Sequence, residues 1–176
     1  IGLLFFQNRQ VQTSISSYLT QRLAEEIDAG VSISSVKYSF FKRLYIYDFL
    51  IEDQTGDTLM YSEFTRIRIK NFKPNKQNIH LHSVSCENFY MNVKVDWDRH
   101  NSMRFFTDWL KSDLPPEEKV VLSIDKIELI NSHFSQIAER AKSPPYGIDF
   151  SDMDIYQINA KAENFVARMD TVYMNI

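Results

Sequence analysis

Leu44–Ile51 (LYIYDFLI) and Thr65–Lys70 (TRIRIK) are the two stretches that decide the fold. The first is dense in aromatic and β-branched residues, which is typical of a β-strand. The second belongs to a strand expected at 62–70 and alternates apolar with basic residues, so that strand has one apolar face and one basic face. Between them, the sequence DQTGD at 53–57 offers turn residues, with Gly56 free to take a positive φ. These segments predict a hairpin.

The same patterns extend over most of the chain. Further strands are expected at 31–36, 79–84, 89–95 and 120–130, and 150–176 is strand-like almost throughout. Because Leu44–Ile51 is apolar on both faces, we expect it to be covered on both sides, on one of them by a helix. Only 4 Gly and 5 Pro are present, which favours long strands joined by few sharp corners and therefore an extended sheet.

Two helices are also expected. Residues 7–29 carry an apolar residue every three or four positions, and Gly30 then suits the end of a helix. A short helix is expected at 102–111, capped by Ser102 and ending before Pro115. The predicted fold class is mostly β with α (α+β): an N-terminal amphipathic helix packed on an extended, curved, largely antiparallel sheet that forms an open apolar groove, plus the short helix.

The first six residues (IGLLFF) are an abrupt apolar run, about a third of the ~20 residues that span a bilayer. One interpretation is the end of a truncated membrane anchor, and the other is a hydrophobic cap on the following helix. The predicted division is an anchor end at 1–6, the amphipathic helix at 7–29, and a groove segment at 30–176 that continues beyond the last residue.

Composition narrows the classes of function. With 44% hydrophobic and 24% charged residues, the sequence is typical of a folded protein. The formal net charge of -3 provides no basic field for a nucleic acid. Cys86 is the only cysteine, so an intramolecular disulfide is excluded.

Few residues could carry chemistry. His80 and His82 lie two apart, so they are either metal ligands or ordinary strand histidines, and no cysteine or carboxylate with ligand spacing accompanies them. The turn at 53–57 lacks the alternating ligands of a calcium loop. The basic residues either bind phosphates or lipid headgroups or blunt edge pairing of the sheet; they are Arg66, Arg68, Lys70, Lys73 and Lys76. With no nucleotide or nucleophile motif, we predict no enzyme, no metal and no cofactor.

A loose repeat runs through the chain. The pattern apolar-x-apolar-x-x-apolar begins at Val31, Ile79, Leu122 and Met153. In two copies an asparagine, Asn88 or Asn131, follows nine residues after the start, and CENF at 86–89 is echoed by AENF at 162–165. Either chance explains this pattern, or strands stack along one axis, each burying its apolar face against its neighbours.

The order of motifs resembles a known family. Five segments follow one another as in the N-terminal region of AsmA/TamB-like proteins. They are VSISSVKYSFF from Val31, L-x-I-x-D-F-x-I-E-D from Leu44, QTGDTL-x-Y from Gln54, the basic-apolar strand, and RFFTDWL from Arg104. The resemblance covers 11–110. It implies an inner-membrane anchor, a periplasmic body in the bacterial envelope, a long sheet curled into an apolar groove that transfers lipid, and an outer-membrane assembly partner.

We therefore expect a membrane-anchored periplasmic segment that binds phospholipid acyl chains along its groove and passes them between the inner and outer membranes. The alternative is a scaffold for outer-membrane protein assembly or secretion that pairs through the sheet edge. For any one strand, an ordinary core explains the alternation equally well, but the strands together carry more apolar surface than two helices cover. The expected groove residues are Ile67, Ile69, Ile79, Leu81, Phe89, Met91, Val93, Val172 and Met174.

Overall fold

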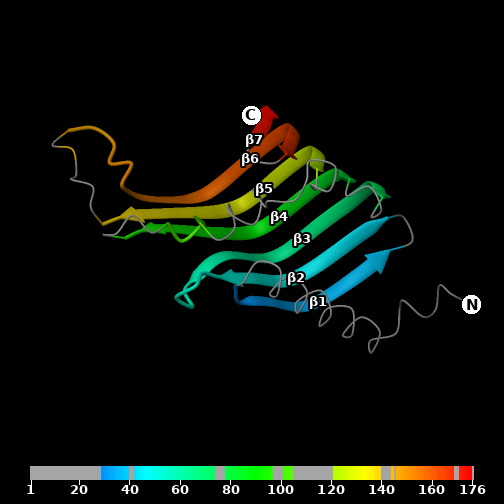
Figure 1. The fold of residues 1–176 in the computed structure, drawn as a ribbon, viewed down its shortest axis with the longest axis horizontal. Coiled ribbons are helices and arrows are strands. Elements are labelled where there is room, and N and C mark those ends of the chain that lie inside the picture. The colour runs from blue at the N-terminus through cyan, green and yellow to red at the C-terminus, as the bar shows by residue number, and fades with distance from the viewer. Residues whose placement is uncertain are drawn as a thin grey trace, which may run out of the picture.

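The computed structural model describes residues 29–39, 42–73, 78–96, 101–104, 121–139, 144, 146–168 and 171–175, which form one seven-stranded sheet with its strands in chain order (Figure 1). The strands are β1 (Val31–Ser39), β2 (Arg43–Glu52), β3 (Thr58–Lys73), β4 (Asn78–Val95), β5 (Val121–Ala138), β6 (Asp152–Arg168) and β7 (Thr171–Asn175).

All neighbouring strands are antiparallel except β4 and β5, which are parallel. The chain therefore returns to the opposite end of the sheet between Val95 and Val121. The described start of this connection lies against the end of β4. There Asn101 bridges to Val95, and the Ser102 amide donates to the Lys94 carbonyl.

The register aligns a set of large apolar side chains on one face of the sheet, called the apolar face below. The opposite face, called the polar face, carries the basic residues of β3 and also an aromatic cluster of Tyr45, Tyr47 and Phe64. One row across the strands consists of Val31, Ile51, Met60, Met91 and Phe134. A second row, nearer the other end of the strands, consists of Tyr38, Leu44, Ile67, Val84 and Ile127.

A hydrogen bond shows that the two rows share a face. Ser62 alternates with Met60 of the first row, and Thr65 alternates with Ile67 of the second. The Thr65 hydroxyl donates to Ser62 Oγ at 2.9 Å, and both side chains are buried. Two residues, Glu63 and Phe64, therefore separate them on the polar face, where regular alternation allows only one.

Similar extra residues form a line across the sheet, called the bend line below. Asp48, Asn88, Asn131 and Gln157 each have a positive φ of 49–56° in the middle of a strand. An extra residue lengthens the polar face and bends the strand, so the sheet curves with the apolar face inside. The strands bend near their middle in Figure 1.

The apolar face is only lightly covered by the described residues. Among them, the buried hydrophobic side chains are Val36, Ile51, Leu59 and Ile124. Ile51 and Leu59 form a cluster at one end of the sheet, against which Ala29 and Met103 pack. Most other apolar residues in the strands are half-buried.

The predicted α+β class is corrected by this structure. The described residues are almost entirely strand and build a single, mostly antiparallel sheet without a described helix. The expected helix at 7–29 lies outside the described residues except for Ala29. Of the expected helix at 102–111 only 102–104 are described: residues 102 and 103 form a turn, Arg104 is helical, and its amide donates to the Asn101 carbonyl.

The strand predictions need two smaller corrections. The strands expected at 79–84 and 89–95 are one strand, β4, because Asn88 takes up the extra residue in a left-handed conformation without ending the pairing. The stretch at 150–176 contains two strands, β6 and β7. Gly56 has the predicted positive φ, at 85°.

The predicted localisation is also corrected. An inner-membrane protein with a periplasmic body requires a spanning anchor, and no helix in the described part of the chain is long and apolar enough to cross a membrane. The apolar run at 1–6, on which that prediction rested, lies outside the described residues.

The repeat has a structural counterpart. In the parallel pair β4 and β5, the copy that starts at Ile79 lies in register with the copy that starts at Leu122. Asn88 and Asn131 therefore occupy matching places, and Asn164 of AENF also has a positive φ, at 56°. The repeated asparagines mark positions where a strand needs a left-handed residue.

Candidate functional site

The register places the predicted groove residues of β3 and β4 on the apolar face. Ile67 and Ile69 on β3 face Val84 and Leu81 on β4, and Phe89, Met91 and Val93 follow along β4. On β7, Val172 pairs with Ala167, which lies opposite Leu122. The remaining members are Ile79 and Met174, and Met174 is exposed.

The structure adds residues that the sequence did not single out. These come from strands that pair far apart in the chain, and their membership was visible only once the register was known: Val36, Leu44, Ile46, Ile124, Ile127, Leu129, Phe134 and Phe165. The apolar face thus extends from β1 to β6 without a charged residue in either of its two rows.

The bend line sets the axis about which the apolar face curves. Because the extra residues lie side by side on successive strands, the sheet folds about an axis that crosses the strands. Neighbouring strands lie ~4.8 Å apart, so seven strands make a trough about 29 Å long. The hydrocarbon core of a bilayer is ~30 Å thick, and one leaflet of acyl chains accounts for about half of it.

The polar face carries the basic strand residues, two of which are paired. Arg66 lies 3.8 Å from Glu87, and Lys70 lies 3.0 Å from Asp125. The side chains of Lys73 and Lys76 lie outside the described part of the structure. The basic side of β3 is therefore partly neutralised by neighbouring strands.

His80 and His82 both face Asp125 on the polar face. His80 Nε2 lies 2.6 Å from one carboxylate oxygen, and His82 Nδ1 lies 3.2 Å from the other. The contacts with His80 and then Lys70 hold the pKa of Asp125 far below its usual value. Within the described ranges no group of histidines, cysteines and carboxylates has the arrangement of a metal site.

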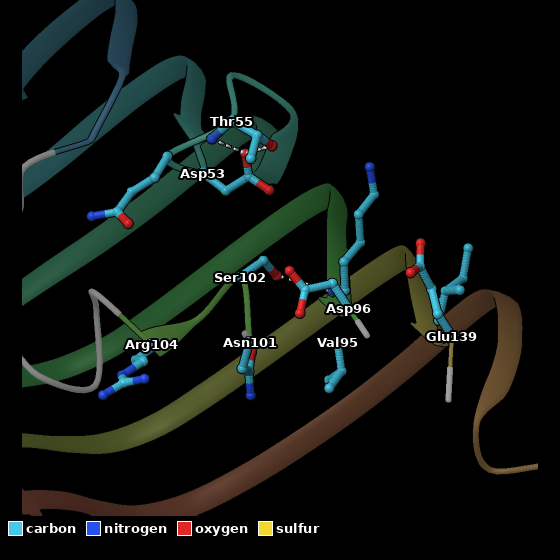
Figure 2. A pocket seen from close by; sticks show the side chains of 11 residues that line it. Asp53, Thr55, Val95, Asp96, Asn101, Ser102, Arg104 and Glu139 are labelled. Atoms are coloured by element: carbon cyan, nitrogen blue, oxygen red, sulfur yellow. Dashed lines mark hydrogen bonds between the residues drawn. The ribbon is translucent and has the colours of Figure 1, made fainter. Parts of the chain in front are cut away.

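A pocket of about 460 Å³ lies at one end of the sheet (Figure 2). Its lining comes from the β2–β3 turn, the ends of β4 and β5, and the start of the β4–β5 connection. The lining residues are Asp53, Gln54, Thr55, Lys94, Val95, Asp96, Asn101, Ser102, Arg104, Ile137 and Glu139.

Hydrogen bonds fix the shape of this pocket. The Asp53 carboxylate accepts from the Thr55 hydroxyl and from the amides of Thr55 and Asp57. Burial alone would raise the pKa of Asp53, but these bonds outweigh it and lower the pKa. Lys94 pairs with Asp57, and this hydrogen bond raises the pKa of the lysine. Ser102 Oγ accepts from the Lys94 amide at 3.0 Å.

No protein-family model, curated protein or solved structure matches the chain significantly. The function proposed below therefore depends on the geometry of the sheet and on the motif order described above.

Proposed function

We propose that the apolar face binds the acyl chains of phospholipids and that the trough passes them from one membrane to another, as the resemblance to AsmA/TamB-like proteins implies. The observation that carries the proposal is the continuous apolar face itself, which crosses six strands while only four of the described hydrophobic side chains are buried. A large apolar surface of this kind marks a ligand or partner site.

Acyl chains suit this surface because they need apolar contact and no directional hydrogen bonds. Each methylene removed from water contributes ~0.8 kcal/mol, so a chain with ten methylenes in contact gains at most about 8 kcal/mol. Since that gain is spread evenly along the trough, a chain can slide from one set of strands to the next without crossing a large barrier. Headgroups stay in water beyond the rim.

The trough also has a suitable length. At ~4.8 Å per strand, an extended acyl chain of one leaflet, about 15 Å long, covers roughly three strands. Seven strands therefore hold about two chains end to end. We infer that lipids move across the strands, along the bend line, and not along any single strand.

Ile69→Glu tests the proposal. Ile69 lies half-buried on the apolar face of β3, where an ionised carboxylate would need to be desolvated beside an acyl chain. We expect the variant to fold and to lose most of its bound phospholipid, measured by mass spectrometry of lipid extracted from the purified protein. Met91→Glu on β4 should give the same result.

Arg68→Glu is the matched control. Arg68 is exposed and is the residue directly before Ile69, and its substitution changes the charge by more than Ile69→Glu does. Lipid content should stay at the wild-type level. Equal lipid content in Ile69→Glu and wild type, or equal loss in both variants, would count against binding on the apolar face.

A second candidate is the scaffold function, favoured by the open edges of the sheet. Among the described strands, β1 and β7 have a neighbour on one side only. Such an edge can pair with a strand of another protein, for example an outer-membrane barrel subunit or a client. If the scaffold function is correct, photo-crosslinkers at the edge position Ser34 on β1 should capture protein, and crosslinkers on the apolar face should capture no lipid.

A further inference from the structure

Four basic residues lie close together on the polar face, near the β1 edge of the sheet. Arg43 on β2 pairs directly with Arg68 on β3. In the next row, Tyr45 on β2 lies between Lys37 on β1 and Arg66 on β3. Rows on one face lie ~7 Å apart and neighbouring strands ~4.8 Å apart, so the four Cα atoms fit within a rectangle of about 7 by 10 Å. These four basic residues are called the basic patch below.

The positive charge of the basic patch is not balanced by its surroundings. Arg43 and Arg68 face each other across two strands, and like charges in this arrangement destabilise a sheet. Within the described residues, no ion pair joins either arginine to a carboxylate, whereas Lys161 on the same face pairs with Glu128 at 3.3 Å. An anionic partner would therefore remove a repulsion as well as add an attraction.

Two carboxylates lie near the basic patch, and both already have contacts. Glu87 on β4 lies 3.8 Å from Arg66, and Glu63 accepts from Asn88 Nδ2 on the bend line. The side chains of Arg66 and Glu87 are 50% and 40% exposed, so their pair is weak and a partner's carboxylate can replace Glu87.

The aromatic cluster lies beside these cations and orders two of them. The rings of Tyr45 and Phe64 are stacked, with their centroids 6.1 Å apart. Lys37 Nζ lies 4.9 Å from the centroid of the Tyr47 ring, and the guanidinium carbon of Arg66 lies 5.4 Å from that of Phe64. Because these contacts restrict two long side chains, less conformational freedom is lost when a partner binds.

The composition and size of this surface favour a protein segment as the partner. Arginine and aromatic side chains are enriched at the centres of protein–protein interfaces, and the fork of an arginine suits a carboxylate. A nucleic acid or an anionic bilayer would extend beyond the basic patch to β5 and β6, which carry more carboxylates than basic residues. A short acidic segment needs to contact only β1 to β3.

We propose that the basic patch and the aromatic cluster bind an acidic segment of a partner protein. Its carboxylates reach Arg43 and Arg68, and its apolar side chains pack against Tyr47 and Phe64. Because this surface lies on the opposite face from the acyl chains, it works independently of lipid binding.

Fluorescence anisotropy with the full chain tests this proposal. The probe is a short fluorescent peptide of alternating glutamate and tyrosine, and the matched probe has glutamine in place of glutamate. We expect the acidic peptide to bind about three- to tenfold more tightly than the neutral one, the size expected for a few exposed ion pairs, and to bind more weakly as salt is raised.

Arg68→Glu should weaken binding of the acidic peptide by about three- to tenfold. It replaces a repulsive pair with an attractive one, so the variant should unfold at a urea concentration no lower than that of wild type. Lys161→Glu makes the same change of charge on the same face, outside the basic patch, and should leave the affinity unchanged.

Two consecutive residues separate this surface from the apolar face. Ile69→Glu should keep peptide binding and lose lipid, whereas Arg68→Glu should lose peptide binding and keep lipid. No binding of the acidic peptide, or equal binding by wild type and Arg68→Glu, would overturn the proposal without affecting acyl-chain binding. Tighter binding of single-stranded DNA or of phosphatidylglycerol vesicles than of the peptide would also overturn it, and would assign the basic patch to a nucleic acid or to a membrane.

Discussion

Replacing Asn131 tests whether left-handed residues hold the bend line. Asn131 has a φ of 50° in the middle of β5. Its side-chain Nδ2 donates to Asn88 Oδ1 at 2.6 Å, and its backbone amide donates to Asn159 Oδ1 at 3.0 Å. A substitution at 131 therefore affects the backbone conformation and one side-chain bond that joins β4 to β5.

The magnitudes decide between alanine and glycine. Both lose the exposed side-chain hydrogen bond, which contributes at most ~0.5–1.5 kcal/mol. Alanine also incurs a left-handed strain of ~1–2 kcal/mol that asparagine largely avoids, whereas glycine has no such strain and instead loses ~0.5–1 kcal/mol through greater freedom of the unfolded chain. We expect Asn131→Ala to be less stable than wild type by about 1.5–3.5 kcal/mol and less stable than Asn131→Gly by about 0.5–1 kcal/mol.

Urea unfolding of the full chain measures these differences. Asn71 provides the control, because it is exposed on β3 and its φ is not positive. At Asn71 the order should reverse, with the glycine variant less stable than the alanine variant by ~0.5–1 kcal/mol. If alanine at 131 equals or exceeds glycine, the left-handed conformation does not determine the bend, and the curvature has another origin.

Three further results follow from the structure. Leu59→Ala, at a side chain that is only 1% exposed, should lower the free energy of unfolding by ~2–4 kcal/mol in urea titrations; a loss below 1 kcal/mol would show that the cluster is not packed as described. Asp125→Asn should cost ~0.2–1 kcal/mol at pH 7, because exposed pairs are weak. Since the folded pKa of Asp125 lies below its unfolded value of ~3.9, the wild-type advantage is present above that pH and shrinks as the pH falls below it; thermal melts from pH 7 to 2 would show a constant difference if the reasoning failed. Burial raises the pKa of the Cys86 thiol on the apolar face, so alkylation at pH 7.5 should be slow in the native chain and slower still with bound lipid; unchanged rates on adding lipid would contradict occupancy near Cys86.

Local pattern was enough to predict most strands and the apolar face. Ile67 and Ile69 alternate with basic residues, and a period of two assigns them to one side whatever the partner strand is. The turn at 53–57 was also predictable, because a glycine was available for the position that needs a positive φ.

Non-local features could not be derived in the same way. The parallel pairing of β4 with β5 joins residues 43 apart in the chain, as Ile79 with Leu122, and no single strand's composition encodes it. The break expected near Asn88 is a bulge inside one strand, since a left-handed asparagine resembles a turn in sequence and yet continues the sheet. The pocket at Lys94 and Glu139 was missed because four separate segments of the chain build it.

Photo-crosslinking on the two faces of one strand tests the central claim most directly. A crosslinking amino acid is placed at Met91, on the apolar face of β4, or at Asn92, the next residue, on the polar face. After irradiation in cells or with phospholipid vesicles, we expect lipid adducts at 91 and none above background at 92. Equal labelling at both positions, or no lipid at 91 in a folded protein, would contradict acyl-chain binding on the apolar face.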